Sequence, residues 1–327
     1  MKLRSIQVLR ALAAISVAVH HVVKFPLGAA GVDLFFVISG FIIASVAPGD
    51  TATAFLAKRV ARIYPLYLIC QAPFFIQALV DSRLTGSLAF TSLTLIPVGG
   101  VSRPALGVGW TLMFEIAFYA AAAASLSLRD YRPVLGGFVV CFLLNNFIRT
   151  SEVLGFVGHP LVLEFLCGVA LVRVPRSPSL GFKAFIGAAS IIVFAWGVEL
   201  PWGWVYAGSA NALYRLFFWG IPAMLFVHSA LSFEEWFKIS WWKPAVILGD
   251  ASYALYLTFS MVVLLGLWWP ITILLAVILA LSVHFLIEKP LVASTMKLFS
   301  RLVVLSRPQS NPSIEQIELS QGKAGQA

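Results

Sequence analysis

Charged side chains are scarce in this chain, because only 11% of its 327 residues are Asp, Glu, Lys or Arg. Soluble globular proteins carry about 25% charged and about 45–50% apolar residues. Here 60% of the residues are hydrophobic, and the mean hydropathy is +0.92. This composition excludes an ordinary soluble protein and predicts an all-α, polytopic membrane protein. The length suits about ten spans, since each needs about 20 residues.

Cysteine is rarer still. The three cysteines, Cys70, Cys141 and Cys167, lie in apolar runs, and no two have CxxC spacing. This pattern indicates neither a zinc site nor a disulfide framework, so we expect no bound metal or cofactor. The net charge of +9 would suggest a nucleic-acid partner in a soluble protein. In a membrane protein, cytoplasmic loops and anionic lipid headgroups explain most of that charge, so the expected partner is the bilayer.

Apolar segments define the predicted architecture, and the first is expected to stay as a span because no small-residue cleavage site follows it. The predicted spans are residues 6–23, 31–47, 64–80, 110–128, 134–149, 155–172, 184–200, 211–231, 245–268 and 270–287. The motif "WWP" is expected to join the last two in a tight hairpin. These limits predict an integral membrane domain at 1–291 and a cytoplasmic amphipathic or disordered tail at 292–327.

Basic residues set the predicted orientation, because cytoplasmic loops are enriched in Lys and Arg. With the N-terminus inside, 18 of the 23 Lys and Arg residues fall in inside segments and 5 in outside segments. If one span were missing or wrongly added, every later loop would be assigned to the opposite side of the membrane, and the excess of basic residues inside would be weaker. The split therefore supports ten spans with both termini in the cytoplasm.

The first span carries polar residues that apolar packing does not explain. Arg10 and His21 are 11 residues apart, so they lie within about 20° of one helix face, with a rise of about 16 Å between them. His20 points about 80° away from Arg10. Ionisable residues inside a membrane indicate function by default. The alternative is that Arg10 snorkels inward and both histidines are interfacial.

Two carboxylates are predicted to lie at the depth of His21. Asp33 is near the outer end of the second span, and Glu115 is near the outer end of the fourth. A carboxylate beside a histidine can orient the ring and raise its basicity. For Asp33 the alternative is an acid at a helix N-terminus. For Glu115 the alternative is a structural ion pair, for example with Arg215 or Arg103.

A basic pair lies in "KRVARIYPLY", before the third span. Arg59 and Arg62 are three residues apart and share a helix face, and Lys58 adds a further charge. Two forked guanidinium groups can clamp a diphosphate at the cytoplasmic side. The alternative is ordinary positive-inside anchoring.

Five further positions give weaker signals. Ser39 and Gly40 are small residues in the middle of the second span, where they favour close helix packing. Glu164 is another intramembrane carboxylate, and Asp250 can cap the ninth span. Near the C-terminus, "HFLIEKPL" places His284 in the membrane.

These segments, in this order, resemble the membrane acyltransferase-3 superfamily, and within it the ExoZ-like exopolysaccharide acyltransferases. The matching pieces are "LRALAAISVAVHH", "GVDLFFVISGFII", "KRVARIYPLY", "WTLMFEIAFY", "EFLCGVAL", "WGIPAML", "SYALYL" and "FLIEKPL". They extend from residue 6 to about residue 291. The resemblance implies a multi-pass protein of the bacterial inner membrane. It also implies O-acyl transfer, usually of acetyl, from cytoplasmic acyl-CoA to a glycan hydroxyl at the outer face.

The family motifs map onto the polar residues described above. The Arg-x10-His motif falls on Arg10 and His21, the Arg-x-x-Arg motif on Arg59 and Arg62, the Ser-Gly-Phe motif on Ser39, Gly40 and Phe41, and the tryptophan and glutamate of the fourth span on Trp110 and Glu115. The chain departs from the family where many members carry a histidine after "SY-LYL", because Phe259 stands there. It also lacks the C-terminal hydrolase-like domain of some members.

The resulting hypothesis assigns a role to each group. His21 is the expected catalytic base, oriented by Glu115 and Asp33, and an acyl-histidine intermediate is left open. The residues expected to bind acyl-CoA as co-substrate are Arg10, Arg59, Arg62 and Ser39. A polysaccharide or a lipid-linked saccharide is the expected acceptor. The alternative function is a transporter or flippase for a lipid-linked saccharide, against which stands the absence of a detectable two-fold internal repeat.

Overall fold

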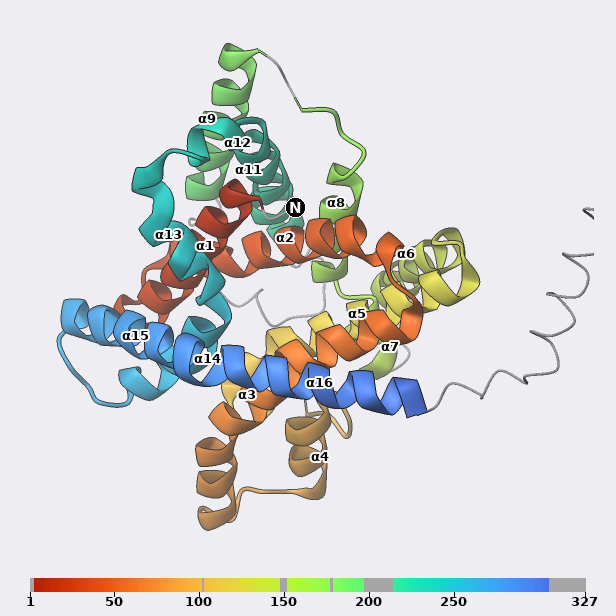
Figure 1. Ribbon diagram of the computed structural model, residues 1–327, viewed down its shortest axis with the longest axis vertical. Coiled ribbons are helices and arrows are strands. Elements are labelled where there is room, and N and C mark those ends of the chain that lie inside the picture. The colour runs from red at the N-terminus through yellow and green to blue at the C-terminus, as the bar shows by residue number, and fades with distance from the viewer. Residues whose placement is uncertain (1–2, 102, 148–151, 177–178, 197–213, 306–327) are drawn as a thin grey trace, which may run out of the picture.

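The computed structural model describes residues 3–101, 103–147, 152–176, 179–196 and 214–305, and this part of the chain is almost entirely helical (Figure 1). No β-strand occurs within it, and the nearest approach to one is an isolated bridge between Val98 and Val101. The predicted all-α class is therefore confirmed.

The helices follow one another with short connections. Their bounds are α1 Arg4–Val23, α2 Gly31–Val46, α3 Ala52–Val80, α4 Gly86–Thr94, α5 Trp110–Leu128, α6 Arg132–Phe147, α7 Glu152–Val157, α8 Leu161–Leu171, α9 Leu180–Trp196, α11 Ile221–Ser232, α12 Glu234–Phe237, α13 Lys243–Asp250, α14 Ser252–Val263, α15 Trp269–Val283 and α16 Lys289–Leu305. Two π-helical segments, η6 (Leu216–Gly220) and η8 (His284–Glu288), lead into α11 and α16.

Every predicted span overlaps a helix. Within the described residues, five helical segments are long and apolar enough to cross a membrane, and α13 with α14 makes a sixth if this pair, bent by 65°, is counted as one span. The predicted spans at 134–149, 155–172, 184–200 and 211–231 correspond to shorter apolar helices. Parts of the first, third and fourth of these lie outside the described residues. The molecule is a polytopic membrane protein with both long and short apolar helices.

The C-terminal part of the chain differs from the simplest prediction. The predicted hairpin between the last two spans is present, but α14 already ends at Val263, the turn contains Gly266, and "WWP" opens α15. The helical path then continues through η8 into α16, an amphipathic helix that ends at Leu305. Residues 292–305 are thus helical, and the predicted disordered part from 306 onward lies outside the described residues.

Glycines let α2 and α8 pack with their backbones almost in contact. A Cβ added at Gly40 would lie 2.1 Å from the carbonyl oxygen of Phe165, and one at Gly168 would lie 2.0 Å from that of Val37. No side chain fits at these distances, so both positions need glycine. The predicted packing role of Gly40 is confirmed.

A carboxylate from far along the sequence holds the start of α1. Glu234, at the start of α12, accepts hydrogen bonds from the backbone N–H groups of Arg4 and Ser5 at 2.8 and 3.0 Å. The Ser5 hydroxyl also donates to it. The first N–H groups of a helix have no partners within the helix, and they favour negative charge. Glu234 therefore fixes the end of α1 from which Arg10 projects.

The helices surround a central space. Figure 1 shows α1 and α2 on one side of it and α3 and α5 on the other, with α14 at the left of the view and α16 running in front of α3 and α5. Helices α9 and α11 lie at the top of the view, and α4 lies at the bottom. Several charged residues of the spans, Arg10 and Glu115 among them, line this space.

Candidate active site

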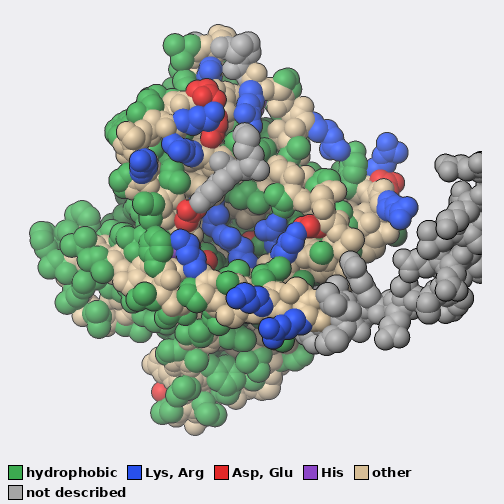
Figure 2. All heavy atoms as spheres, viewed as in Figure 1, with side chains coloured by type: hydrophobic (Ala, Val, Ile, Leu, Met, Phe, Trp, Pro, Cys, Tyr) green, Lys and Arg blue, Asp and Glu red, His purple; other side chains and the backbone are tan. Residues whose placement is uncertain are grey.

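A cavity of about 710 Å³ lies between α1, α2, α3, α5, α14 and the η8–α16 segment. Its lining combines apolar side chains with charged ones. The charged lining residues are the cations Arg10, Arg59, Arg62 and Lys289 and the carboxylates Glu115, Asp250 and Glu288. Figure 2 shows Lys and Arg side chains gathered in the middle of this face, around the hollow. The cavity is large enough for a sizeable anionic ligand.

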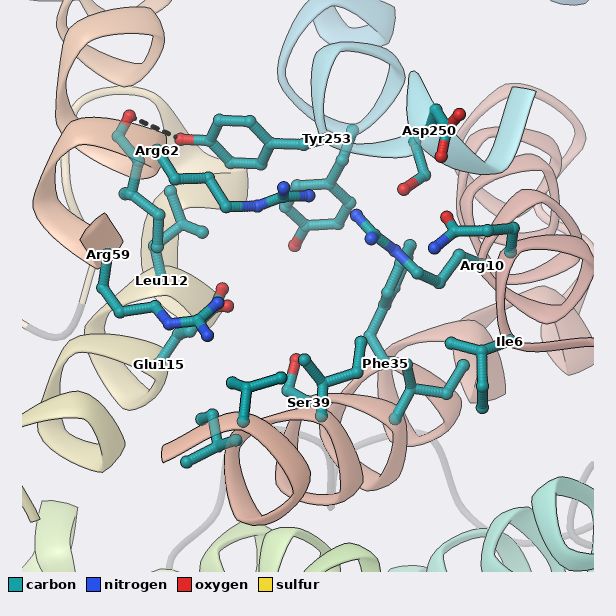
Figure 3. Close-up of a pocket in the computed structure, with 18 of the residues that line it drawn as sticks. Ile6, Arg10, Phe35, Ser39, Arg59, Arg62, Leu112, Glu115, Asp250 and Tyr253 are labelled. Atoms are coloured by element: carbon teal, nitrogen blue, oxygen red, sulfur yellow. Dashed lines mark hydrogen bonds between the residues drawn. The ribbon is translucent and has the colours of Figure 1, made fainter. Parts of the chain in front are cut away.

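Three arginines project into the cavity from opposite walls. Arg10 comes from α1, and Arg59 and Arg62 come from α3, with Arg10 and Arg62 pointing toward each other (Figure 3). In the described part of the chain, none of the three forms an ion pair with a carboxylate. Guanidinium groups facing one another in a cavity repel, so this arrangement favours an anion between them.

Arg59 is held by aromatic rings rather than by a carboxylate. Its guanidinium lies 5.1 Å from the ring centre of Phe55 and 5.7 Å from that of Tyr119. Its buried Nε atom has no hydrogen-bond partner among the described residues. Cation–π contacts hold the group in place without using its N–H donors, which stay available for a ligand.

Glu115 lies in this cavity, on the wall formed by α5. Its carboxylate accepts a hydrogen bond from the Tyr119 hydroxyl, one helical turn further on. Figure 3 shows the carboxylate close to the guanidinium of Arg59, with Ser39 on the wall opposite. The structure thus brings Arg10, Arg59, Arg62, Ser39 and Glu115 around one space.

Asp33 has a different partner from the one expected. Its carboxylate binds Arg215 through two hydrogen bonds, from Nε at 2.7 Å and from Nη2 at 2.8 Å. Both side chains are buried, with 0% and 2% of their surface exposed. The Arg215 guanidinium also lies over the ring of Trp219, at 5.2 Å. Asp33 is therefore part of a buried ion pair, and the suggested orientation of His21 by Asp33 is not what the structure shows.

His21 lies at the exposed C-terminal end of α1. Its Nδ1 is 2.8 Å from the carbonyl oxygen of Val17, and its ring packs on Phe259 with 5.0 Å between centres. A carbonyl oxygen only accepts, so Nδ1 carries the hydrogen and Nε2 presents a lone pair. The Val17 carbonyl thus gives His21 the tautomer that a general base needs. Sequence reasoning had assigned this orienting role to a carboxylate.

An aromatic layer separates His21 from the cavity. Phe35 and Tyr256 line the cavity, and their ring centres are 6.0 Å apart. Phe259 lies 6.3 Å beyond Tyr256 and contacts His21 on its other side. His21 is not among the residues that line the cavity, so the single space predicted from Arg10 to His21 is divided at this layer.

Comparison with known proteins assigns the chain to a family. A family model described as "Acyltransferase domain" matches residues 3–289, nearly the whole chain. The chain belongs to this acyltransferase-3 family. It is 32% identical to "Exopolysaccharide production protein ExoZ" of Rhizobium meliloti (strain 1021), over 83% of this chain and 91% of that protein. It is 25% identical to "Acyltransferase MdmB" of Streptomyces mycarofaciens, over 73% of this chain and 69% of that protein. No solved structure matches it.

This membrane acyltransferase also contains Glu164, a buried acid that the sequence singled out but for which it suggested no partner. Glu164 is 1% exposed, and neither of its carboxyl oxygens has a hydrogen-bond partner in the described residues. A Cβ at Gly220 would lie 2.7 Å from its Cγ, so the acid fills a place kept open by a glycine. Glu164 lies outside the cavity lining.

The acyltransferase cavity also contains groups whose role sequence reasoning did not find. His284 Nδ1 lies 2.6 Å from Glu288 Oε2, and both side chains are buried. Asp250 ends α13 and lines the cavity, and α14 starts without a side-chain cap, so the suggested capping role of Asp250 is wrong. The four-residue spacing of His284 and Glu288 was a usable signal, since such residues are neighbours on a helix.

Proposed function

We propose that this enzyme transfers an acyl group, most simply acetyl, from cytoplasmic acyl-CoA to a hydroxyl of an exported polysaccharide. The observation that carries the proposal is the cavity with Arg10, Arg59 and Arg62 on facing walls. CoA carries a diphosphate and a further phosphate, and guanidinium forks match such groups. The exopolysaccharide protein among the relatives supports a glycan acceptor. A bacterial inner membrane location follows, because donor and acceptor then lie on opposite sides.

The proposed chemistry uses His21 as the base. Its Nε2 takes the proton of the sugar hydroxyl while that oxygen attacks the thioester carbonyl. The carbon–sulfur bond then breaks, and the imidazolium returns the proton to the departing CoA sulfur. The hydrogen bond to Val17 supports this role because it leaves Nε2 unprotonated. A covalent acyl-histidine on the same atom is the variant of this route.

The donor has to reach from the arginines to His21. The helix rise from Arg10 to His21 is about 16 Å, and an extended pantetheine arm is on the order of 15–20 Å long. The arm therefore spans the distance only if it passes the layer of Phe35 and Tyr256. In this proposal Ser39 and Glu115 line its path, the Tyr119 hydroxyl holds the Glu115 carboxylate, and Asp33 supports the fold through its buried ion pair.

Replacing His21 tests the proposed function. We expect His21→Ala to lower the rate of acyl transfer to polysaccharide by about 100-fold or more, because general base catalysis contributes about 10²–10⁴-fold. Purified enzyme with radiolabelled acetyl-CoA and polysaccharide acceptor gives the rate. His20→Ala is the matched control, since His20 is adjacent and bonds the carbonyl of Phe25 instead. Full transfer by the His21 variant would exclude this residue, and a saccharide transporter would show no acyl-CoA consumption at all.

A further inference from the structure

The wall of the cavity that η8 forms presents an unused hydrogen-bonding atom. His284 is 5% exposed and lines the cavity, and its Nδ1 is taken by Glu288 at 2.6 Å. The other ring nitrogen, Nε2, is buried and has no hydrogen-bond partner among the described residues. A buried polar atom without a partner is unfavourable, so a ligand that supplies the missing hydrogen bond gains affinity.

The hydrogen bond to Glu288 fixes what His284 offers. An ionised carboxylate accepts and does not donate, so Nδ1 carries the hydrogen, and in the neutral ring Nε2 presents a lone pair. The second nitrogen therefore accepts a hydrogen bond from an N–H or O–H group. A phosphate has only acceptors, and the Glu288 carboxylate would repel it. His284 is thus unsuited to the groups that the arginines bind.

The middle of the acyl donor carries the matching groups. The pantetheine arm contains two secondary amides, and each N–H loses its water on entering a cavity within the membrane. The arm lies between the phosphates, which Arg59 and Arg62 match, and the thioester, which must approach His21. Other neutral acceptors, Gln7 and Ser252 among them, also line the cavity. His284 differs from them in that a buried carboxylate, Glu288, holds its ring in one orientation.

We propose that Nε2 of His284 accepts a hydrogen bond from an amide N–H of the pantetheine arm, and that Glu288 orients the ring for this contact. This proposal rests on the proposed function, since it takes acyl-CoA as the donor. It makes His284 a binding residue for the arm and Glu288 a positioning residue. Neither takes part in proton transfer to the acceptor.

Binding measurements with two ligands test the proposal. The ligands are CoA and adenosine 3′,5′-bisphosphate, which lacks the arm, and isothermal titration gives the affinity of the purified full-length protein for each. We expect His284→Ala to weaken CoA binding about 3- to 10-fold, the effect of one hydrogen bond, and to leave the bisphosphate unchanged. Equal weakening of both ligands would place the nucleotide at His284 and overturn the proposal, as would no change in either.

Two amide variants separate the lost acceptor from a disturbed fold. In His284→Gln the side-chain oxygen reaches the position of Nε2, whereas in His284→Asn the amide reaches only the position of Nδ1. We expect the Gln variant to bind CoA nearly as the wild type does and the Asn variant to bind it as weakly as His284→Ala does. A large fall in turnover at saturating acetyl-CoA, with unchanged CoA affinity, would make His284 catalytic and overturn the binding role. Failure of the wild type to bind CoA would instead refute the proposed function.

Discussion

At the scale of single residues, the protein separates two kinds of buried charge. Arg215 is neutralised by Asp33 in a bidentate ion pair with almost no exposed surface. Arg59 and Arg62 line a cavity instead and, within the described residues, have no carboxylate in ion-pair contact. A buried pair supports structure, whereas cations left unpaired around an empty space indicate a ligand.

The cavity arginines should therefore control affinity for the donor. We expect Arg59→Ala or Arg62→Ala to raise the KM for acyl-CoA about tenfold or more, since each removes charge-assisted hydrogen bonds worth about 1.5–3 kcal/mol. Arg83→Ala is the control, because Arg83 is exposed and pairs with Asp81. Steady-state kinetics at several salt concentrations measure the effect. An unchanged KM would mean that Arg59 and Arg62 serve only as positive-inside anchors of the membrane domain.

At the scale of elements, contacts between distant segments place the site. Glu234 ties the start of α1, and two glycines bring α2 against α8. Neither contact involves a ligand-facing side chain. Both determine where Arg10 and Ser39 stand relative to α3.

Loss of the Glu234 cap should loosen α1. We expect Glu234→Ala to lower the free energy of unfolding by about 1–3 kcal/mol, because it leaves the N–H groups of Arg4 and Ser5 without their acceptor. Thermal melting in detergent and hydrogen exchange at the first turn of α1 measure the effect. The neighbouring Glu235→Ala is the control, since the Glu235 side chain is 85% exposed and accepts a hydrogen bond from Lys238 at the surface. Equal melting of both variants would show that the cap contributes little.

The contact between α2 and α8 should tolerate no side chain at its glycines. We expect Gly40→Ala to destabilise the protein by about 1–3 kcal/mol or more, because its Cβ would meet the Phe165 backbone at 2.1 Å. Gly136→Ala in α6 has nothing within 4 Å of the added atom, and we expect it to be neutral or slightly stabilising. Denaturation of both variants gives the comparison. A Gly40 variant as stable as the Gly136 variant would contradict the close packing.

At the scale of the whole molecule, the cavity lies toward the end of the bundle where α1 starts and α16 begins. The distribution of basic residues predicts that this end faces the cytoplasm, where the proposed function requires it for access to acyl-CoA. The turn between α14 and α15 then lies at the outer surface. The direction of acyl transfer across the membrane therefore depends on sidedness, that is, on which end of the bundle faces the cytoplasm.

Cysteine labelling tests that sidedness. In a background without Cys70, Cys141 and Cys167, we expect a membrane-impermeant maleimide to label Leu265→Cys in intact cells. Lys297→Cys, on an exposed part of α16, should react only after permeabilisation. The reverse pattern would invert the topology and move the donor to the outer face.

Local signals in the sequence predicted much of this protein. Apolar runs predicted the positions of the helices. The three-residue spacing of Arg59 and Arg62 predicted that both point the same way from one helix face, and both line one cavity. The partners of Asp33 and of the α1 N-terminus were out of reach, since Arg215 and Glu234 lie 182 and about 230 residues away along the chain. Sequence spacing says nothing about such contacts. The bend between α13 and α14 falls inside the predicted span 245–268, although Gly249 and Asp250, which are common in turns, stand just before it.

The aromatic layer between the cavity and His21 bears on the electrical insulation of the membrane. A channel wide enough for a pantetheine arm would also pass water and ions, and each charge crossing a potential of 100 mV dissipates about 2.3 kcal/mol. Phe35, Tyr256 and Phe259 pack together at this position, between the cavity and His21. In the proposed function the pantetheine arm itself fills the opening that it makes in this layer. A donor of that kind would act as its own plug, so that a thioester could reach an acceptor on the other side without a standing leak.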